Sequence, residues 1–351
     1  MLNQKVISEF LRENSVDAAF IQKNENCRYI SGFTGSDSYL FLSGENNYLL
    51  TDSRYTEQAK EEATGFTVIN YAGRLAEAVA GLVQKHRVRK LGVENILTYR
   101  MYLSLQEQMP DIDFSFCETD QLRQIKGQAE IEKIMEACRI SDEGFRKIIP
   151  LIQAGKTEAE LRTALECAML EAGSEGKSFD TIVASGWRSA YPHGTATDKL
   201  IETGDLITFD FGAIYQGYHS DITRTVAVGH ITDRQRFLYD SVLDCVLYIE
   251  QIMKAGIKAC DIDQEARSFL KKKELDSYFT HALGHGVGLE IHETPVLAPR
   301  DKTILMPGMV ETIEPGVYIP GTGGVRIEDT VAIQKEGISI LTKFPKEFLC
   351  V

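Results

Sequence analysis

Acidic and histidine side chains gather beside glycines in four segments of the second half of the chain. Asp210 and Asp221 each lie in a β-prone stretch, and Gly212 and Gly217 between them suit a turn. We expect two neighbouring antiparallel strands to bring the two carboxylates together. Because a buried, unpaired carboxylate is costly, two of them side by side need a cation. A pair of surface aspartates that flank a hairpin is the alternative interpretation.

The second segment is a glycine-rich loop that contains three of the seven histidines, His281, His285 and His292. A single histidine is usually a satisfied core or surface residue. Three in one glycine-rich loop favour a ligand or an acid–base site. A phosphate-binding loop is disfavoured, because no Lys-Ser or Lys-Thr pair follows the glycines.

The third and fourth segments each carry a glutamate. Glu314 precedes Pro-Gly, which ends the strand there, and Glu328 follows a glycine turn. Alternation along that last strand places Arg326 and Glu328 on one face. The candidate site therefore has five members, four carboxylates and one imidazole: Asp210, Asp221, His285, Glu314 and Glu328.

This oxygen-rich set suits two hard or borderline divalent ions, such as Mn²⁺, Co²⁺ or Zn²⁺. Four carboxylates balance the charge of two such ions. Two ions about 3.5–4 Å apart clamp and activate a water, whose pKa falls to about 7 on a catalytic zinc. The hydroxide attacks carbonyl groups, so the set indicates metal-assisted amide hydrolysis.

The elements that must position these residues fall into two parts. The first third alternates short helices and strands, which predicts a small α/β domain. Polar residues cluster at 119–128, so we expect a domain of residues 1–122 and a second domain of residues 123–351. In the first domain we expect a helix from Leu2 to Leu11, strands at 18–21, 48–51, 66–69 and 90–93, and helices at 55–63 and 75–86.

In the second domain, helix signals alternate with β-rich stretches. A helix is expected from Ala129, and capping boxes at Thr157 and Thr232 begin two more. This pattern predicts an α+β domain with antiparallel strand pairs.

Composition limits the partners and the compartment. The 351 residues carry a net charge of −13, which disfavours nucleic acid and anionic membranes as partners and favours a cation. Seven widely spaced cysteines without a C-x-x-C pair indicate reduced thiols. No apolar run reaches 18 residues, and the first residues lack a secretory pattern. We expect a cytoplasmic protein.

The order and flanks of the five residues resemble the pita-bread metallopeptidases, a family that includes methionine aminopeptidase, aminopeptidase P and prolidase. The matching flanks are Gly-His-Gly-Val-Gly around His285, Ile-Glu-Pro-Gly around Glu314 and Val-Arg-Ile-Glu-Asp around Glu328. Residues 29–36 and 50–55 resemble the N-terminal domain of the creatinase and prolidase branch. The resemblance implies an α/β N-terminal domain, a pita-bread catalytic domain with a curved antiparallel sheet, and a homodimer.

The resemblance also implies a role for each residue. Asp210 would chelate one metal ion, and His285 and Glu314 the other. Asp221 and Glu328 would bridge the two ions, of which Mn²⁺ is the first expectation and Co²⁺ or Zn²⁺ the alternatives. The catalytic side chains would be His193, His292 and Glu314, with Glu314 moving a proton to the leaving nitrogen. The substrate-binding set would be His193, His281, His292, Tyr318 and Arg326.

Several branches of the family remain open. Methionine aminopeptidases usually lack such an N-terminal domain, creatinase lacks the metal ligands, and non-catalytic binding relatives usually lose ligands. The other two branches cut an Xaa-Pro bond. Several prolidases carry an arginine soon after His-Glu-x-Pro, where this chain has Val296, and its next arginine is Arg300. We therefore expect an Xaa-Pro aminopeptidase acting at the free N-terminus of peptides, with an Xaa-Pro dipeptidase as the alternative.

Overall fold

Strands and helices alternate through the first unit, residues 1–123, in the α/β pattern that the sequence predicts. The structure is a computed structural model that describes residues 4–351; Leu2 lies outside the described residues. One mixed sheet has the order β4-β3-β2-β1-β5-β6. Its elements are α1 (Gln4–Glu13), β1 (Ala18–Ile21), α2 (Asn24–Ser31), β2 (Tyr39–Leu42), β3 (Asn47–Thr51), α3 (Thr56–Glu62), β4 (Thr67–Asn70), α4 (Leu75–Lys85), β5 (Lys90–Val93), α5 (Tyr99–Gln108) and β6 (Asp113–Phe116).

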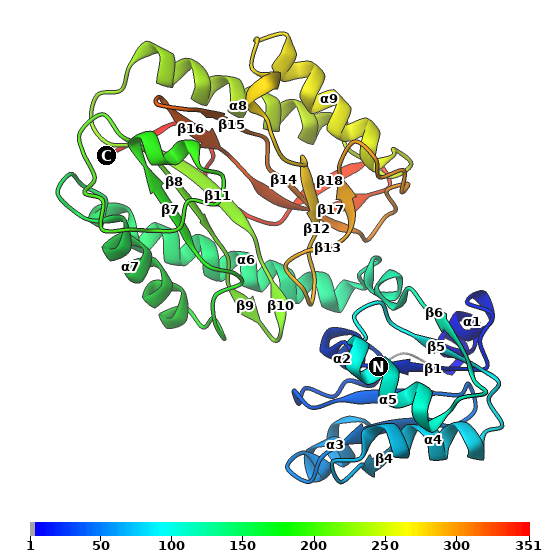
Figure 1. Ribbon diagram of the computed structural model, residues 1–351. Coiled ribbons are helices and arrows are strands. Elements are labelled where there is room, and N and C mark those ends of the chain that lie inside the picture. Colours follow the sequence, from blue (N-terminus) through cyan, green and yellow to red (C-terminus); the bar gives the residue numbers. More distant parts are fainter. Residues whose placement is uncertain (1–3) are drawn as a thin grey trace. The chain divides into compact units, whose positions relative to one another are not determined.

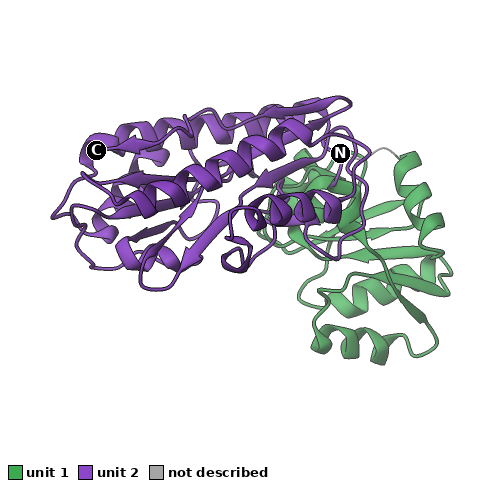
Figure 2. Ribbon diagram, turned by 90° about the horizontal axis from the view of Figure 1, so that it is seen from above, with its two compact units in different colours: residues 1–123 green, residues 124–351 purple. Residues whose placement is uncertain are grey.

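The second unit, residues 124–351, is purple in Figure 2. All five candidate site residues lie within these bounds. Its four long helices are α6 (Gln128–Ile148), α7 (Glu158–Glu171), α8 (Asp233–Ile252) and α9 (Ala259–Lys271). The capping box predicted at Thr157 is present: Thr157 Oγ1 accepts a hydrogen bond from the Glu160 amide, and the Glu160 carboxylate accepts one from the Thr157 amide. Thr232 caps α8 in the same way with Gln235.

Two main antiparallel sheets carry the site. The first has the order β19-β11-β8-β7 and is antiparallel except for the parallel pair of β11 and β19. Its strands are β7 (Ile182–Ser185), β8 (Leu206–Phe211), β11 (Ile222–Ala227) and β19 (Leu349–Cys350). The second has the order β13-β12-β14-β17-β18, with β12 (Gly284–Gly286), β13 (Glu293–Leu297), β14 (Val310–Ile313), β17 (Asp329–Gln334) and β18 (Gly337–Ile340). This is the α+β, pita-bread arrangement that the sequence predicts.

Helices α6 and α7 cover the first sheet, and helices α8 and α9 cover the second (Figure 1). Residues of α6 and α7 share an apolar core with β8 and β11, around Phe145 and Phe209. Residues of α8 and α9 share a second core with β14 and β17, around Val242 and Ile313. Two short hairpins complete the unit: β9 (Ile214–Tyr215) with β10 (Tyr218–His219), and β15 (Gly316–Ile319) with β16 (Gly323–Arg326). Within residues 4–351, no helix is long and apolar enough to cross a membrane.

Candidate metal centre and substrate pocket

The two aspartates come from neighbouring antiparallel strands. Asp210 lies in β8 opposite Thr223 of β11, and Asp221 immediately precedes the first pair of that ladder, Ile222 with Phe211. Gly212 starts the connection between the strands, where an added Cβ would lie 2.0 Å from the Ser220 carbonyl oxygen. Only glycine fits at this close approach, so the sequence fixes how near the two aspartate-bearing strands come.

The other three residues come from the second sheet and the strands beside it. His285 is the central residue of β12, Glu314 directly follows β14, and Glu328 lies between β16 and β17. Thr223 connects Glu328 with Arg326. Its hydroxyl donates to Glu328 Oε2 at 2.6 Å and accepts from Arg326 Nε at 3.2 Å. Arg326 and Glu328 therefore share a face, while Ile327 packs into the core.

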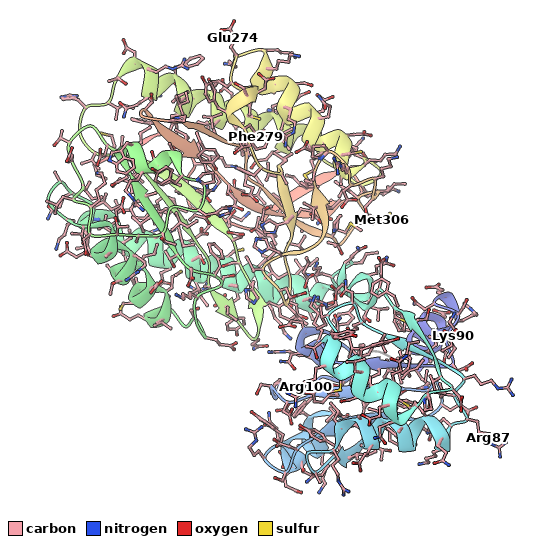
Figure 3. The ribbon with its side chains drawn as sticks, in the orientation of Figure 1. Arg87, Lys90, Arg100, Glu274, Phe279 and Met306 are labelled. Atoms are coloured by element: carbon pink, nitrogen blue, oxygen red, sulfur yellow. The ribbon has the colours of Figure 1, made fainter. Side chains whose placement is uncertain are left out.

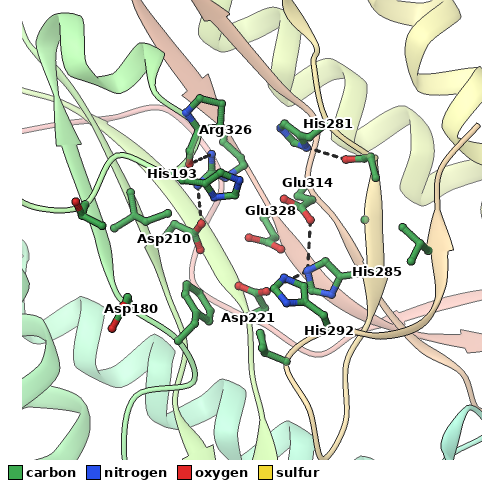
Figure 4. Close-up of a pocket in the computed structure, with 18 residues that line it drawn as sticks. Asp180, His193, Asp210, Asp221, His281, His285, His292, Glu314, Arg326 and Glu328 are labelled. Carbon is green, nitrogen blue, oxygen red and sulfur yellow. Dashed lines mark hydrogen bonds and ion pairs between the residues drawn. The ribbon is translucent and has the colours of Figure 1, made fainter. Parts of the chain in front are cut away.

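The four carboxylates and the imidazole converge on one region (Figure 4). His285 Nε2 lies 3.5 Å from both Asp221 Oδ2 and Glu314 Oε1. Ligand atoms of Asp221, His285 and Glu328 all lie within 4.8 Å of one another. Three buried carboxylate oxygens here lack a hydrogen-bond partner, Asp210 Oδ1, Asp221 Oδ1 and Glu328 Oε1. Buried carboxylate oxygens without a hydrogen-bond partner fit divalent cations, which would supply the missing contacts.

Protonation states agree with a metal centre. Burial, followed by the neighbouring carboxylates, raises the pKa of Asp221 and Glu328 well above the usual range, and burial raises the pKa of Glu314 to about 8. Burial lowers the pKa of His285 to about 4. A neutral His285 forms no ion pair with these carboxylates. Its Nδ1 lies 3.1 Å from the Gly286 carbonyl and therefore carries the hydrogen, which leaves Nε2 as a lone-pair donor toward the carboxylates.

A pocket of about 480 Å³ opens beside the cluster. His193, His281 and His292 line it from three separate segments. The rings of His292 and His285 meet edge to face, with centroids 4.4 Å apart. The remaining wall includes the apolar side chains of Phe179, Ile182, Pro192, Ile291 and Val296. The pocket thus combines an apolar wall with a few convergent polar groups, as ligand sites do.

Tyr318 lies behind this wall. It is 6 % exposed and is not among the pocket-lining residues. Its hydroxyl accepts a hydrogen bond from Arg326 Nη1 at 2.7 Å and lies 2.9 Å from His281 Nε2. His281 Nδ1 lies 2.7 Å from the Ala282 carbonyl, so the hydrogen is on Nδ1 and Tyr318 donates to Nε2. Tyr318 therefore orients His281 and Arg326, whereas Arg326 itself lines the pocket and binds Asp210 Oδ2 at 2.5 Å.

Residues on the chain before β12 hold His281 in place. Phe279 packs edge-on against the His281 ring, with ring centroids 5.1 Å apart. Figure 3 shows Glu274, which follows α9, at the outer edge of the unit. Arg267 stacks on Phe279 and donates to the His281 carbonyl at 2.6 Å. Burial, followed by the charge of Arg326, lowers the pKa of His281 to about 4, so this imidazole is neutral.

Comparison with known proteins decides the family. The model of metallopeptidase family M24 matches residues 132–335, and that of the creatinase/prolidase N-terminal domain matches residues 5–125. The chain belongs to metallopeptidase family M24. It is a metallopeptidase of the branch that carries the creatinase/prolidase N-terminal domain, and its family implies divalent metal ions. These findings confirm the resemblance seen in the sequence.

This M24 chain is similar along its whole length to proteins named for cleavage next to proline. An Xaa-Pro dipeptidase of Pyrococcus horikoshii is 41% identical, covering 99% of both chains. The structure of an Xaa-Pro dipeptidase from Bacillus anthracis has a TM-score of 0.96 at 42% identity, covering 99% of this chain and 100% of that one. An X-Pro aminopeptidase structure from Thermotoga maritima has a TM-score of 0.89 at 39% identity, covering 98% and 99%.

Sequence reasoning missed several residues that hold this M24 site together. They are Thr223, between Arg326 and Glu328, and the buried charges Lys126, Arg224, Glu293 and Asp329. Glu293 had a visible signal, because it directly follows the histidine of the His-Glu-x-Pro sequence. Lys126 had none, since its partner lies far along the chain.

Proposed function

We propose that the protein is an Xaa-Pro dipeptidase that uses two divalent metal ions, with Mn²⁺ as the first candidate. The observation that carries the proposal is the set of orphaned, buried carboxylate oxygens beside a pocket lined by three histidines. The relatives named dipeptidase favour this activity over the aminopeptidase that Val296 suggested. Val296 does line the pocket, while Arg300 is exposed.

Each side chain has a proposed task. Asp210 would offer its unpartnered Oδ1 to one ion, His285 and Glu314 would hold the other, and Asp221 and Glu328 would be shared between the two ions. When bound, the ions would supply an activated water as the nucleophile. Glu314 would carry a proton to the proline nitrogen as the C–N bond breaks.

The histidines handle the substrate. His292 is placed to donate a hydrogen bond to the oxyanion that develops on the scissile carbonyl. His193 lies across the pocket beside Asp210 and Arg326 (Figure 4) and contacts the substrate from that side. His281, fixed by Tyr318, contacts the proline side of the substrate. A proline nitrogen has no hydrogen to offer, so recognition must rest on shape and on proton delivery.

The test compares three substrates on enzyme reconstituted with Mn²⁺, Co²⁺ or Zn²⁺. We expect Leu-Pro to be cleaved at least about tenfold faster, in kcat/KM, than Leu-Pro-Ala, a difference of about 1.4 kcal/mol in transition-state binding. Acetyl-Leu-Pro-Ala should not be cleaved. Faster cleavage of the tripeptide would support an Xaa-Pro aminopeptidase instead. Equal rates on the free and the acetylated peptide would contradict exopeptidase activity. Metal analysis of the purified protein checks for about two ions per chain.

The proposal extends to assembly and location. We propose a homodimer, which light scattering on the purified protein would check. We also propose that the protein works in the cytoplasm. Support comes from the cysteines: all seven are free thiols in residues 4–351, the form that a reducing compartment maintains.

A further inference from the structure

A buried ion pair lies just behind the loop that carries His292. Lys126 Nζ lies 2.8 Å from Glu293 Oε2, and their side chains are only 2% and 4% exposed. Neither residue lines the pocket. His292 lines the pocket, whereas its neighbour Glu293, the first residue of β13, is buried.

Glu293 holds the loop of residues 287–292 at several points. Its Oε1 accepts a hydrogen bond from the Glu290 amide at 3.2 Å. At Gly288, an added Cβ would lie 2.5–2.7 Å from the Glu293 carboxylate, so the backbone packs directly on that group. The Gly288 carbonyl in turn accepts from the His219 amide at 2.8 Å. The path from the carboxylate to His292 is therefore a short stretch of tightly packed backbone.

Lys126, the cation of this ion pair, is itself held by backbone contacts. Its ammonium also donates to the Gln124 carbonyl at 3.3 Å, and its amide donates to the Gly308 carbonyl at 2.9 Å. Glu311 of β14 is 1% exposed and buried in the same region; burial raises its pKa well above the usual range, and the Lys126 charge acts in the opposite sense. Removing the ammonium would leave the buried Glu293 carboxylate without its cation, which is strongly unfavourable.

We propose that Lys126 and Glu293 are positioning residues that hold His292 at the scissile carbonyl. This inference rests on the proposed function for the role of His292, and it goes beyond it by naming what fixes that side chain. Neither residue lines the substrate pocket. Their loss should act on turnover through His292, because a displacement of about 1 Å can cost about 100-fold in rate.

The kinetic test uses the full-length, metal-loaded enzyme and Leu-Pro. We expect Glu293→Gln and Lys126→Met to lower kcat by about tenfold or more, with KM within about twofold. Metal content should stay at the wild-type level. The control is Lys199→Met, which removes a half-buried lysine paired with Asp205 at the same N–O distance of 2.8 Å. That variant should keep its turnover.

The deciding comparison repeats Glu293→Gln in a His292→Ala background. If Glu293 acts through His292, the substitution should change the residual kcat by less than about twofold there. An equal fold loss in both backgrounds would show a general structural effect and overturn the proposal. An unchanged kcat in Glu293→Gln alone would overturn it as well.

A second readout does not depend on peptidase activity. A glutamate-specific endoprotease should cut after Glu290 faster in Glu293→Gln than in the wild type or in Lys199→Met, as the loop is released. Equal cutting rates would contradict the anchoring role. If His292→Ala leaves turnover intact, the proposed function of His292 fails, and the cutting rates still decide whether the pair anchors the loop.

Discussion

Asp221 and Glu328 lie between the other proposed ligands, and each has an oxygen without a hydrogen-bond partner. Replacing Asp221 with Asn or Glu328 with Gln removes one negative charge and little volume. Two adjacent cations then repel each other with less shielding. We expect both variants to lose activity and to retain fewer metal ions, as measured by elemental analysis. Full activity with two ions retained would contradict the two-metal centre.

His292 differs from these ligands because it lines the pocket and has a proposed task in the transition state. His292→Ala should bind metal as the wild type does. Its kcat should fall by about 100- to 1,000-fold, the usual cost of removing one donor to an oxyanion. Parallel loss of metal and activity would instead place His292 among the ligands.

The raised pKa of Glu314 gives the metal-free protein a distinctive pH dependence. Between its ordinary value of 4.5 and about 8, Glu314 binds a proton in the folded state that the unfolded chain does not bind. That contribution to stability is present at low pH and is lost as the pH rises toward 8. The lowered pKa of His285, about 4 against 6.5, acts in the opposite sense, but only below pH 6.5.

We therefore expect the Tm of metal-free protein to fall between pH 6.5 and 8. Added Mn²⁺ should reverse the trend, since metal binding displaces protons from the ligands and strengthens as the pH rises. Thermal scans of both forms check this, with Glu314→Gln as the control that should make the metal-free curve less steep; Asp221 and Glu328, whose pKa values are also raised, contribute in the same sense. A metal-free Tm that rises across this window would contradict the assigned protonation.

At the scale of elements, close backbone contacts set where the ligands lie. An added Cβ at Gly284 would lie 2.0 Å from the Thr312 carbonyl oxygen, so β12 must shift before any larger residue fits. We expect Gly284→Ala to cost about 1–3 kcal/mol, as overpacking does, and to lower metal content by displacing His285. Gly81→Ala in α4, where nothing lies within 4 Å, should leave Tm unchanged or slightly raised. Calorimetry of both variants measures the contrast.

The sequence predicted elements well where periodicity and caps were strong. Thr157 and Thr232 begin α7 and α8 as expected, and four strands of the first unit lie within a residue of the predicted ranges. It did not predict α2, β2, α5 or β6. Helix α5, for example, leaves Tyr99 and Leu103 exposed, so its apolar spacing does not mark one buried face.

Side-chain partners that are distant in the chain could not be predicted from the sequence either. The ligand set was visible because each member lies beside a glycine or proline turn. The supports were not visible: Arg224 binds Asp329, which is 105 residues away, and Lys126 binds Glu293, which is 167 residues away. Charge pairs of this kind have no periodicity, because only the folded backbone brings them together.

At the scale of the whole molecule, the last residues of the chain complete the catalytic unit. The amides of Lys343 and Phe344 donate to the buried Asp142 carboxylate. Arg224, which is buried, donates to the Phe344 and Pro345 carbonyls and to the carbonyl of Glu328. The C-terminal segment therefore satisfies charges that lie directly beside the proposed metal ligands.

We expect a chain ending at Leu341 to lose its metal centre. Leaving one buried charge unpaired costs about 3–5 kcal/mol, a large part of the roughly 5–15 kcal/mol that stabilises a domain. Limited proteolysis should leave residues 1–123 resistant and degrade the rest. Deleting Val351 alone, which keeps the Asp142 and Arg224 contacts, should preserve metal binding. A truncated chain with intact metal content would show that the tail is dispensable.

The parallel pairing of β19 with β11 also orders events during synthesis. The first unit is complete once residue 123 has been made, and domains that emerge first generally fold first. The sheet of the second unit must wait, because β19, which pairs with β11, is made after the other strands of that sheet. A nascent chain can therefore carry a folded first unit before the second unit is complete. We expect hydrolytic activity only after β19 has left the ribosome and paired with β11.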